Sequence, residues 1–347
     1  MLDDLEGIRK IDESDMLGVI SRFSKLVEAG YKSAKNLDYR FDELRGGIRF
    51  LGLGGSAIGG DLIRDWIGKH IPGGIRVERG YDISSPIDSN SLVICCSYSG
   101  NTVETLSMLN QILKSKSKNV IIITSNGELS KTAKKKSLPL IKLEKGMPPR
   151  TSLPEVVSAV SVITDQLKWT KKASSEILAA SDSCGSFLKR NLAANVPESK
   201  NIAKQLAHQM HGFIPIVIAP YNMESVARRW KTQMNENAKQ HCFFGTFPEL
   251  THNEIVPWQR DSRSEMLLAL LLKSNERNVL LSERFKKFRE TLSSSAKSIE
   301  IEPVGRGRIE MLMSHVLMAD YTSAYSAILS KIDPTPVDEI VRFKSNK

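Results

Sequence analysis

An apolar run leads into a hydroxyl-rich turn at residues 92–102, which read LVICCSYSGNT. The apolar part, Leu92–Cys96, is short, rich in β-branched side chains and bounded by polar residues, which predicts a buried strand. Apolar side chains then recur at helical spacing through residues 103–113, which predicts a helix. The turn between them therefore joins the carboxyl end of a strand to the amino end of a helix.

Such a turn favours an anion, because backbone N–H groups and the helix dipole both point toward it. Ser97, Ser99 and Thr102 add three neutral hydroxyl donors, and Gly100 permits a left-handed backbone. A site built from many neutral donors suits a phosphate group. The alternative is an ordinary N-cap, in which Ser and Thr serve only the helix.

A second glycine-rich turn lies upstream, in residues 48–61, which read IRFLGLGGSAIGGD. The pattern predicts a strand, a turn and a helix that continues to about residue 67. Further strands are predicted at 75–77, 120–124 and 138–143, and a helix at 128–136. Strands that alternate with helices predict an α/β fold with a doubly wound parallel sheet. Ligands bind beyond the carboxyl ends of such strands, so the two turns can face one pocket.

The sequence pattern also predicts a division of the chain into two domains. Residues 147–154 carry three prolines in eight positions and predict a linker, with one domain at 1–153 and another at 154–347. The first domain begins with a helical extension over residues 1–45. The second starts with helices at 155–169 and 173–193. A second αβ unit follows, with strands at 214–219, 242–245, 266–272 and 299–303 and helices at 225–240 and 309–329.

Composition limits the class of protein. With 347 residues, 41% hydrophobic and 25% charged, the chain is typical of a soluble globular protein of two domains. Its formal charge of +10 suits an anionic partner. The basic run 134–136 is typical of a solvated face, and aromatic residues are few, so we expect no nucleic-acid partner.

Cysteine usage indicates a reducing compartment. Cys95 and Cys96 are adjacent in the predicted strand and face opposite sides of the sheet, while Cys184 and Cys242 are isolated. The residues after Met1 do not resemble a signal peptide, and no apolar run approaches the roughly 18 residues of a membrane span. We therefore expect free thiols, no membrane partner and a cytoplasmic location.

Six motifs carry a resemblance to a known family. They are Gly54–Asp61, Ser97–Thr105, Pro148–Arg150, Asn235–Asn237, Thr251–Glu254 and Asp333–Pro336. The first two resemble the signature turns of a sugar isomerase (SIS) domain. Together, over about residues 48–344, the six resemble the archaeal and bacterial bifunctional phosphoglucose/phosphomannose isomerases. Each motif alone is modest, and their order along the chain is what makes the match specific.

The resemblance implies two SIS domains, each a flavodoxin-like parallel sheet, in a homodimer whose active site lies between domains and subunits. It implies reversible conversion of glucose 6-phosphate or mannose 6-phosphate to fructose 6-phosphate, with no metal and no cofactor. By resemblance the substrate phosphate is held by Ser56, Ser97, Ser99 and Thr102, and Gly55 and Arg150 also bind the substrate. The implied catalytic residues are Arg150 for the enediolate charge, Glu236 as base, His252 for ring opening and a lysine near the C-terminus.

Two assignments stay open. The lysine is Lys344 or Lys331, and the threonine that admits the mannose epimer in this family is Thr335 or Thr322. Independent chemistry agrees with the remaining roles, since one carboxylate can move a proton between C2 and C1 on one face of a cis-enediol. A guanidinium can stabilise the charge on O1 and O2, and a histidine suits ring opening.

Other interpretations compete with these. Glu236 could be a solvated ion-pair residue, His252 a loop residue, and Arg150 the partner of a surface carboxylate. His208 and His211 have metal-ligand spacing on a helix, but no third ligand stands at a recognisable spacing, so we interpret both as structural.

Two other functions also fit part of the chain. The residues Gly52, Gly54, Ala57 and Glu78 match a dinucleotide fingerprint and would indicate an NAD-dependent dehydrogenase, which leaves the hydroxyl turn unexplained. A non-enzymatic sugar-phosphate sensor is the other alternative. It would have no need of Glu236 or His252, and such sensors ordinarily carry a DNA-binding module, for which we find no segment.

Overall fold

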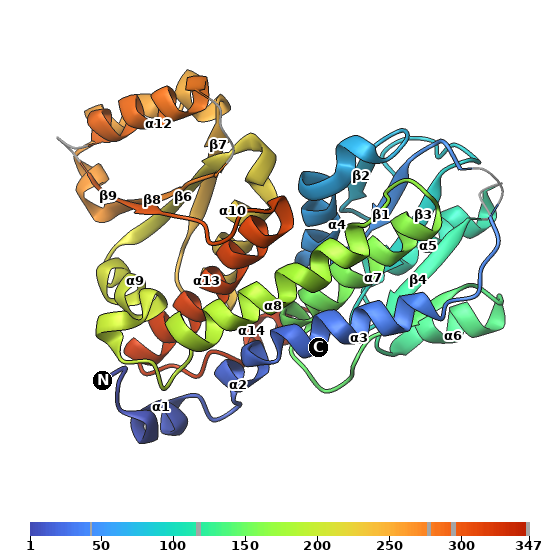
Figure 1. Cartoon of the computed structure of the whole chain (residues 1–347), viewed down its shortest axis with the longest axis horizontal. Helices are drawn as coiled ribbons and strands as arrows, with labels where there is room; N and C mark the ends of the chain where they lie inside the picture. The colour runs from blue at the N-terminus through green and yellow to red at the C-terminus, as the bar shows by residue number, and fades with distance from the viewer. Residues whose placement is uncertain (42–43, 116–118, 276–278, 293–295, 345–347) are drawn as a thin grey trace. The chain divides into compact units, whose positions relative to one another are not determined.

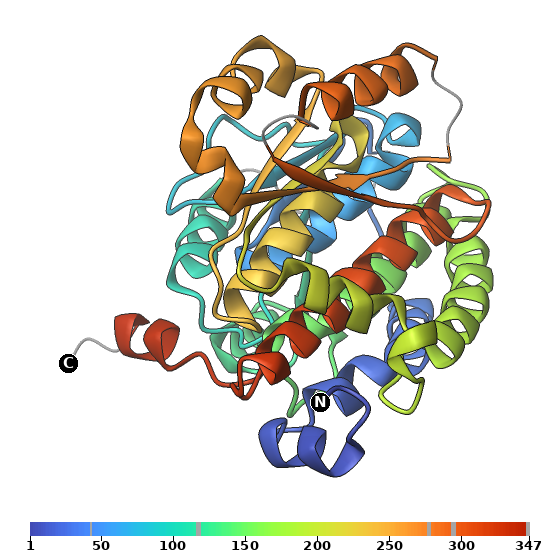
Figure 2. The same cartoon turned by 90° about the vertical axis from the view of Figure 1, so that its left-hand side faces the viewer.

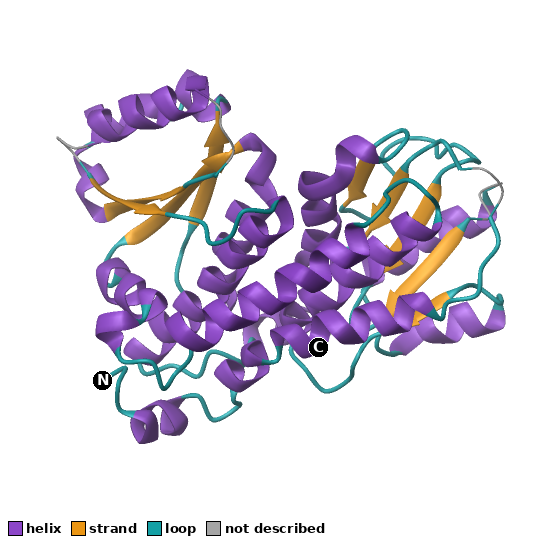
Figure 3. Cartoon of the chain, viewed as in Figure 1, coloured by secondary structure: helices purple, strands orange, loops and turns teal. Residues whose placement is uncertain are grey.

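The computed structural model describes residues 1–41, 44–115, 119–275, 279–292 and 296–344. The chain forms two compact units. The central unit is Arg22–Asp182, and the terminal unit combines Met1–Ser21 with Ser183–Lys347. Helix α8 (Ala173–Asn191) runs across the border between them. Figures 1 and 3 show the helices and strands, and each unit is described below by itself.

The central unit is a five-stranded parallel sheet in the order β2-β1-β3-β4-β5. Its strands are β1 (Ile48–Leu51), β2 (Ile75–Glu78), β3 (Leu92–Cys96), β4 (Val120–Thr124) and β5 (Leu140–Lys142). Its helices are α3 (Phe23–Lys35), α4 (Gly54–Ile67), α5 (Val103–Lys114), α6 (Gly127–Lys135) and α7 (Leu153–Gln166). This is the flavodoxin-like strand order, so the predicted fold class is confirmed here.

Burial explains why these strands were predictable. Every residue of β3 and β4 is buried, as expected of central strands in a sheet that is covered on both faces. On one face Val93, Cys95 and Ile122 pack with the apolar stripe of α5. All four cysteines are buried free thiols, as expected. Burial raises the pKa of the Cys96 thiol to about 12, so this side chain is neutral.

The proline-rich stretch is not a linker. Pro149 opens a short 3₁₀ turn, η2 (Pro149–Ser152), and Pro154 lies in the first turn of α7. Prolines are tolerated at these positions because the first N–H groups of a helix have no partner within it. The residues from Arg150 to Pro154 are buried, and α7 packs in the central unit against α3 and α4. The boundary between the two units along the chain therefore falls near residue 182 instead of the expected 153.

The terminal unit is a four-stranded parallel sheet in the order β7-β6-β8-β9. Its strands are β6 (Ile214–Pro220), β7 (Phe243–Phe247), β8 (Leu267–Leu272) and β9 (Lys297–Ile301). Its helices are α1 (Leu5–Ile11), α2 (Met16–Ser21), α9 (Ile202–Met210), α10 (Glu224–Glu236), α11 (Ile255–Arg260), α12 (Val279–Leu292), α13 (Arg308–Leu329) and α14 (Asp338–Lys344). In Figures 1 and 2, α12 covers one face of the sheet, and α10 and α13 cover the other. The α/β prediction therefore holds for both units.

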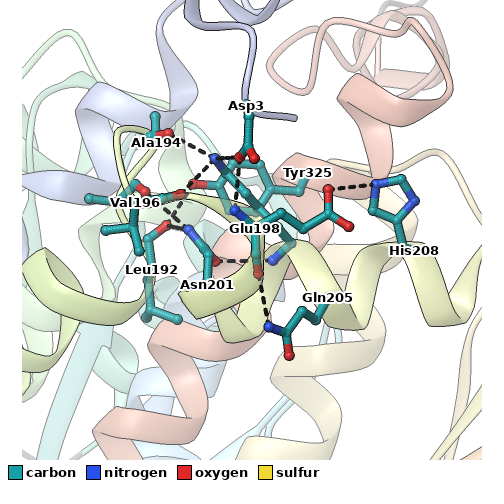
Figure 4. A network of polar contacts seen from close by, with 11 residues as sticks. Asp3, Leu192, Ala194, Val196, Glu198, Asn201, Gln205, His208 and Tyr325 are labelled. Atoms are coloured by element: carbon teal, nitrogen blue, oxygen red, sulfur yellow. Dashed lines mark hydrogen bonds and ion pairs between the residues drawn. The ribbon is translucent and has the colours of Figure 1, made fainter. Parts of the chain in front are cut away.

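A buried lysine explains why the first 21 residues belong to the terminal unit (Figure 4). Lys204 of α9 is fully buried, and its ammonium donates to Asp3 Oδ1 at 2.9 Å and to the backbone oxygens of Ala194 and Val196 at 2.9 and 2.8 Å. The same ammonium lies 5.7 Å from the ring centroid of Tyr325. A buried cation that lost any of these partners would be strongly unfavourable, so the network fixes the N-terminal segment to α9.

Among the helices in the described ranges, none combines the length and the apolar character that a bilayer crossing requires.

The buried start of α7 holds one carboxylic acid, Glu155, which is 1% exposed. Burial raises its pKa to about 7, although the backbone N–H of Glu144 donates to both of its oxygens at 3.0 and 3.2 Å. The folded protein therefore keeps a proton that the unfolded chain loses near pH 4.5. The free energy of unfolding must then fall as the pH rises from about 4.5 to about 7.

We expect Glu155→Gln to remove this pH dependence, because the amide does not ionise. Urea unfolding at several pH values should show that wild type loses up to about 1.4 kcal/mol per pH unit relative to the variant between pH 5 and 7. Glu128→Gln, which changes an exposed carboxylate on α6, should keep the wild-type slope. Parallel pH profiles for wild type and Glu155→Gln would contradict the assignment.

Candidate active site

The two special turns lie at neighbouring strand ends of the central sheet. Strands β1 and β3 are paired in parallel with Leu51 opposite Cys95, so the turn that follows each strand leaves the same edge of the sheet. Ser56 lies in the first turn of α4 and is nearly buried, and its hydroxyl contacts the thiol of Cys96. Ser97 follows β3 directly and is also buried. The prediction that both turns share one edge is therefore confirmed.

The hydroxyl turn is ordered by its own side chains. The hydroxyls of Ser97 and Thr102 are 2.8 Å apart, and the backbone N–H of Gly100 donates to Ser97 Oγ at 3.2 Å. Ser99 is exposed, and its hydroxyl accepts from the N–H of Asn101 at 3.3 Å. Thr102 occupies the N-cap position of α5, but its side chain makes no capping hydrogen bond. The ordinary N-cap does not account for this turn, and its hydroxyls form a connected group at the edge of the sheet.

Backbone contact with the next turn holds this group in place. Gly100 has φ of +70°, and a Cβ on it would lie 1.8 Å from the carbonyl oxygen of Asn126. Gly127 has φ of +75°, and a Cβ there would lie 2.3 Å from the carbonyl oxygen of Ser99. The Ser125 hydroxyl also donates to the Tyr98 carbonyl at 2.7 Å. The turn after β3 is thus locked to the turn after β4, and only glycine fits at the two contact points.

Arg150 reaches the same edge from η2. A Cβ on Gly55 would lie 3.1 Å from the Cα atom of Arg150, so the turn after β1 and η2 are in backbone contact. Arg150 is 3% exposed. The central unit therefore gathers all of the expected residues that it contains, which are Gly55, Ser56, Ser97, Ser99, Thr102 and Arg150.

In the terminal unit, one lysine joins two of the motifs. Glu236 is the last residue of α10, and the ammonium of Lys239 donates to its backbone oxygen at 2.8 Å. The same ammonium donates to the backbone oxygens of Asp333 and Pro334 at 3.2 and 2.9 Å. The end of α10 and the segment Asp333–Pro336 therefore lie side by side. Sequence reasoning missed Lys239, since these acceptors are backbone oxygens that no side-chain pattern marks.

The other candidates of the terminal unit are more exposed. His252 ends the short turn η5 (Glu249–His252) after β7, and Lys344 ends α14. Both are exposed, as is Lys331. Within the described ranges, neither His252 nor Lys344 forms a side-chain hydrogen bond or ion pair that ties it to Glu236. Their roles therefore stay predictions.

The two threonines lie in different segments of the terminal unit. Thr322 is fully buried in α13, beside Ser323, whose hydroxyl accepts from the Asn237 side chain at 2.9 Å. Thr335 is half-buried in the segment that Lys239 holds against α10, and its N–H donates to Asp333 Oδ1 at 2.9 Å. The side-chain oxygens of both threonines are buried, and Thr335 is the one in the segment that adjoins Glu236.

The residues behind two competing interpretations, the dinucleotide fingerprint and the histidine pair, have other surroundings in the structure. Glu78 is buried and accepts from Arg49 Nη1 at 2.5 Å, and its pKa is lowered despite burial by hydrogen bonds from Ser84 and Arg49. Because the Glu78 carboxylate already has these partners, it is not a free acceptor for the ribose of a dinucleotide. His208 Nε2 lies 3.2 Å from Glu198 Oε2, and His211 falls just beyond α9. Across the described parts of the chain, no three His, Cys, Asp or Glu side chains group as metal ligands would.

Comparison with known proteins decides the family. Over 330 residues the chain is 32% identical to the bifunctional phosphoglucose/phosphomannose isomerase of Caldicellulosiruptor bescii, in an alignment that covers 90% of this chain and 93% of that protein. The chain belongs to this isomerase family. Residues 199–346 also match the model of the bacterial phospho-glucose isomerase C-terminal SIS domain. The resemblance carried by the six motifs is thereby confirmed.

This isomerase family member is also similar to a curated epimerase and to a solved structure of an aminotransferase domain. It is 29% identical over 208 residues to the D-glucosamine-6-phosphate 4-epimerase of Sulfolobus acidocaldarius, which covers 60% of this chain and 62% of that protein. Its fold is similar to the C-terminal domain of glucosamine-fructose-6-phosphate aminotransferase from Francisella tularensis. That match has a TM-score of 0.74 at 14% identity and covers 92% of this chain and 98% of that structure. The low identity makes the second match evidence of fold alone.

The lock on the hydroxyl turn predicts a strong effect of Gly100→Ala. The new methyl group would meet a carbonyl oxygen of the next turn, in addition to the left-handed backbone strain. We expect a loss of about 2–5 kcal/mol in the free energy of unfolding, measured by urea denaturation. Gly146→Ala is the matched control, because Gly146 also has positive φ but open space around it. It should lose only about 1–2 kcal/mol, and equal losses would contradict the lock.

Proposed function

We propose that the protein reversibly converts glucose 6-phosphate and mannose 6-phosphate to fructose 6-phosphate. The observation that carries the proposal is the hydroxyl turn, which presents Ser97, Ser99 and Thr102 at the carboxyl edge of a parallel sheet in a member of this isomerase family. A phosphate there would accept from hydroxyls and from the N–H groups that begin α5. These neutral donors bind the charged group without a salt bridge.

We assign proton transfer to Glu236. An aldose–ketose conversion moves one proton between C2 and C1, and a single carboxylate can take and return it through a cis-enediol. The backbone oxygen of Glu236 is held by Lys239, so the end of α10 that carries the carboxylate is fixed against Asp333–Pro336. A base fixed in this way suits repeated transfer between two carbons that are one bond apart.

We assign the remaining catalytic roles from the charge of each side chain and from its position in the fold. Arg150 would stabilise negative charge on O1 and O2 of the enediolate. His252 would act as acid and base at O5 during ring opening, for which an exposed imidazole in the turn after β7 is suited. We assign the C-terminal lysine to Lys344 and the threonine that admits mannose to Thr335. We propose that no metal or cofactor takes part.

We further propose that the chain acts as a homodimer. Helix α14 supports this proposal, because it exposes three apolar side chains on one short helix: Ile340, Val341 and Phe343, the last 91% exposed. Apolar side chains gathered on a surface element are favourably covered by another subunit. Light scattering of the purified protein tests this, and a monomeric mass at micromolar concentration would contradict it.

A second candidate function is epimerisation of an amino-sugar phosphate. It rests on the 29% identity to a D-glucosamine-6-phosphate 4-epimerase. An epimerase would return an aldose with inverted C4 and no ketose. Product analysis by NMR after incubation with glucose 6-phosphate, mannose 6-phosphate and glucosamine 6-phosphate separates the two functions.

We expect Glu236→Gln to lose at least about 10²-fold in turnover, since the amide keeps the shape but cannot take a proton. A coupled assay of fructose 6-phosphate formation from both aldose phosphates, with EDTA present throughout, measures this. Glu224→Gln, at the other end of the same helix, should keep wild-type turnover. Near-native turnover in Glu236→Gln would remove this residue from the mechanism, and wild-type activity that needs added metal would contradict the metal-free proposal.

We expect Thr102→Ala to raise the dissociation constant roughly 10- to 150-fold, as for loss of one hydrogen bond to a charged group. The factor should be the same for glucose 6-phosphate, mannose 6-phosphate and 6-phosphogluconate, because the three share the phosphate. Isothermal titration measures it, with Ser107→Ala on the body of α5 as control. A loss confined to one ligand would mean that the turn contacts the sugar instead.

A further inference from the structure

The terminal unit holds a basic cavity at the carboxyl edge of its own sheet. It measures about 210 Å³ and is lined in part by Pro220, Lys273, Ser274, Lys286, Arg289 and Glu300. Pro220 is the last residue of β6, and Lys273 and Ser274 follow β8 directly. Helix α12 supplies Lys286 and Arg289, and it covers this face of the sheet (Figure 1). A single water needs only about 10–15 Å³ of such volume, so the cavity admits an anion of several atoms.

The place of this cavity in the fold matches that of the hydroxyl turn. In the central sheet, β1 has β2 on one side and β3 on the other. In the terminal sheet, β6 has β7 on one side and β8 on the other. The chain thus reverses its direction of winding between β6 and β8, as it does between β1 and β3. Ligands of open α/β sheets bind at this switch point, beyond the carboxyl ends of the strands.

The chemistry of the cavity differs from that of the hydroxyl turn. Three of its lining side chains, Lys273, Lys286 and Arg289, are cationic, and Glu300 is the single carboxylate among the lining residues. Glu300 lies between two of the cations, with Oε1 3.2 Å from Arg289 Nη1 and Oε2 3.4 Å from Lys273 Nζ. Among the described residues, Lys286 forms no ion pair. Lys273 Nζ also lies 3.6 Å from Oε1 of Glu302, which is not one of the lining residues, so Lys286 is the lining cation that an entering anion would meet outside an ion pair among the described residues.

We propose that this cavity is a second anion site, which binds the phosphate group of a small phosphorylated molecule. Its charged donors favour a group with two or more negative charges, such as a phosphomonoester dianion or a diphosphate. Leu281 and Phe285 form an apolar wall against which a short carbon skeleton can lie. The proposal does not depend on the isomerase assignment, because none of these residues belongs to the six family motifs.

Titration calorimetry of the full chain with pyrophosphate at low salt tests the proposal. We expect Lys286→Glu to weaken one binding event at least roughly tenfold, as for loss of a charge-assisted contact. Lys287→Glu is the matched control, because Lys287 is the next residue of α12, is exposed and does not line the cavity. Glu300→Gln should tighten the same event roughly two- to fivefold, since it removes a competing carboxylate.

Thr102→Ala separates this site from the hydroxyl turn. The event sensitive to Lys286→Glu should persist in Thr102→Ala with unchanged affinity, whether or not the turn itself binds phosphate. No binding by wild type at millimolar pyrophosphate, equal effects of Lys286→Glu and Lys287→Glu, or weaker binding in Glu300→Gln would each overturn the proposal. Acetate in place of pyrophosphate should not compete, because a monoanion gains little from the second cation.

Discussion

The central unit depends on one contact between two pieces of backbone. The turn after β3 lies so close to the turn after β4 that neither Gly100 nor Gly127 has room for a side chain. Both strands are fully buried, so neither turn can move away without disturbing the core. The hydroxyls of Ser97 and Thr102 are therefore held in position before any ligand arrives. Such preorganisation lowers the entropy that a bound phosphate would otherwise have to offset.

The parallel arrangement of strands gives each unit one edge where functional side chains collect. In the central sheet, the residues at this edge carry mostly hydroxyls, which would bind the phosphate that we propose there through the direction and number of their hydrogen bonds. In the terminal sheet, the residues at the equivalent edge carry ammonium and guanidinium groups. The strand order thus fixes where each edge lies, and the residues that follow the strands fix which donors it carries.

Local sequence patterns predict the central strands of this protein well, but not its division into units or helix α12. Strands 92–96 and 120–124 agree with the structure to the residue, because short continuous apolar runs of this kind are typical of strands that are buried on both faces of a parallel sheet. The prolines near residue 150 misled the division into domains, since proline also begins helices and its burial there comes from α3 and α4. Helix α12 escaped prediction because its buried Phe285 and Phe288 lie among many charges.

Sequence patterns do not predict contacts between distant parts of the chain. The pairing of Asp3 with Lys204, which brings the first residues into the terminal unit, joins positions that no short pattern relates. The same holds for Lys239, which brings Glu236 next to Pro334. The hydroxyl turn was predictable because all of its donors lie within six consecutive residues, whereas the surroundings of Glu236 are assembled from two separate segments.

Two buried titratable groups, Cys96 and Glu155, lie close to one another in the central unit, near the residues of the hydroxyl turn. The Ser56 hydroxyl contacts the Cys96 thiol, and the Glu155 carboxyl lies close enough to Cys96 to raise the pKa of that thiol in addition to burial. Below a pH of about 7, both buried groups are neutral, so neither of them would repel an anion bound at the turn. Above that pH, ionised Glu155 places a charge in a medium of low dielectric, where repulsion of a phosphate is poorly screened. The ionisation of Glu155 that weakens the fold would therefore also oppose binding of the phosphate that we propose for this turn.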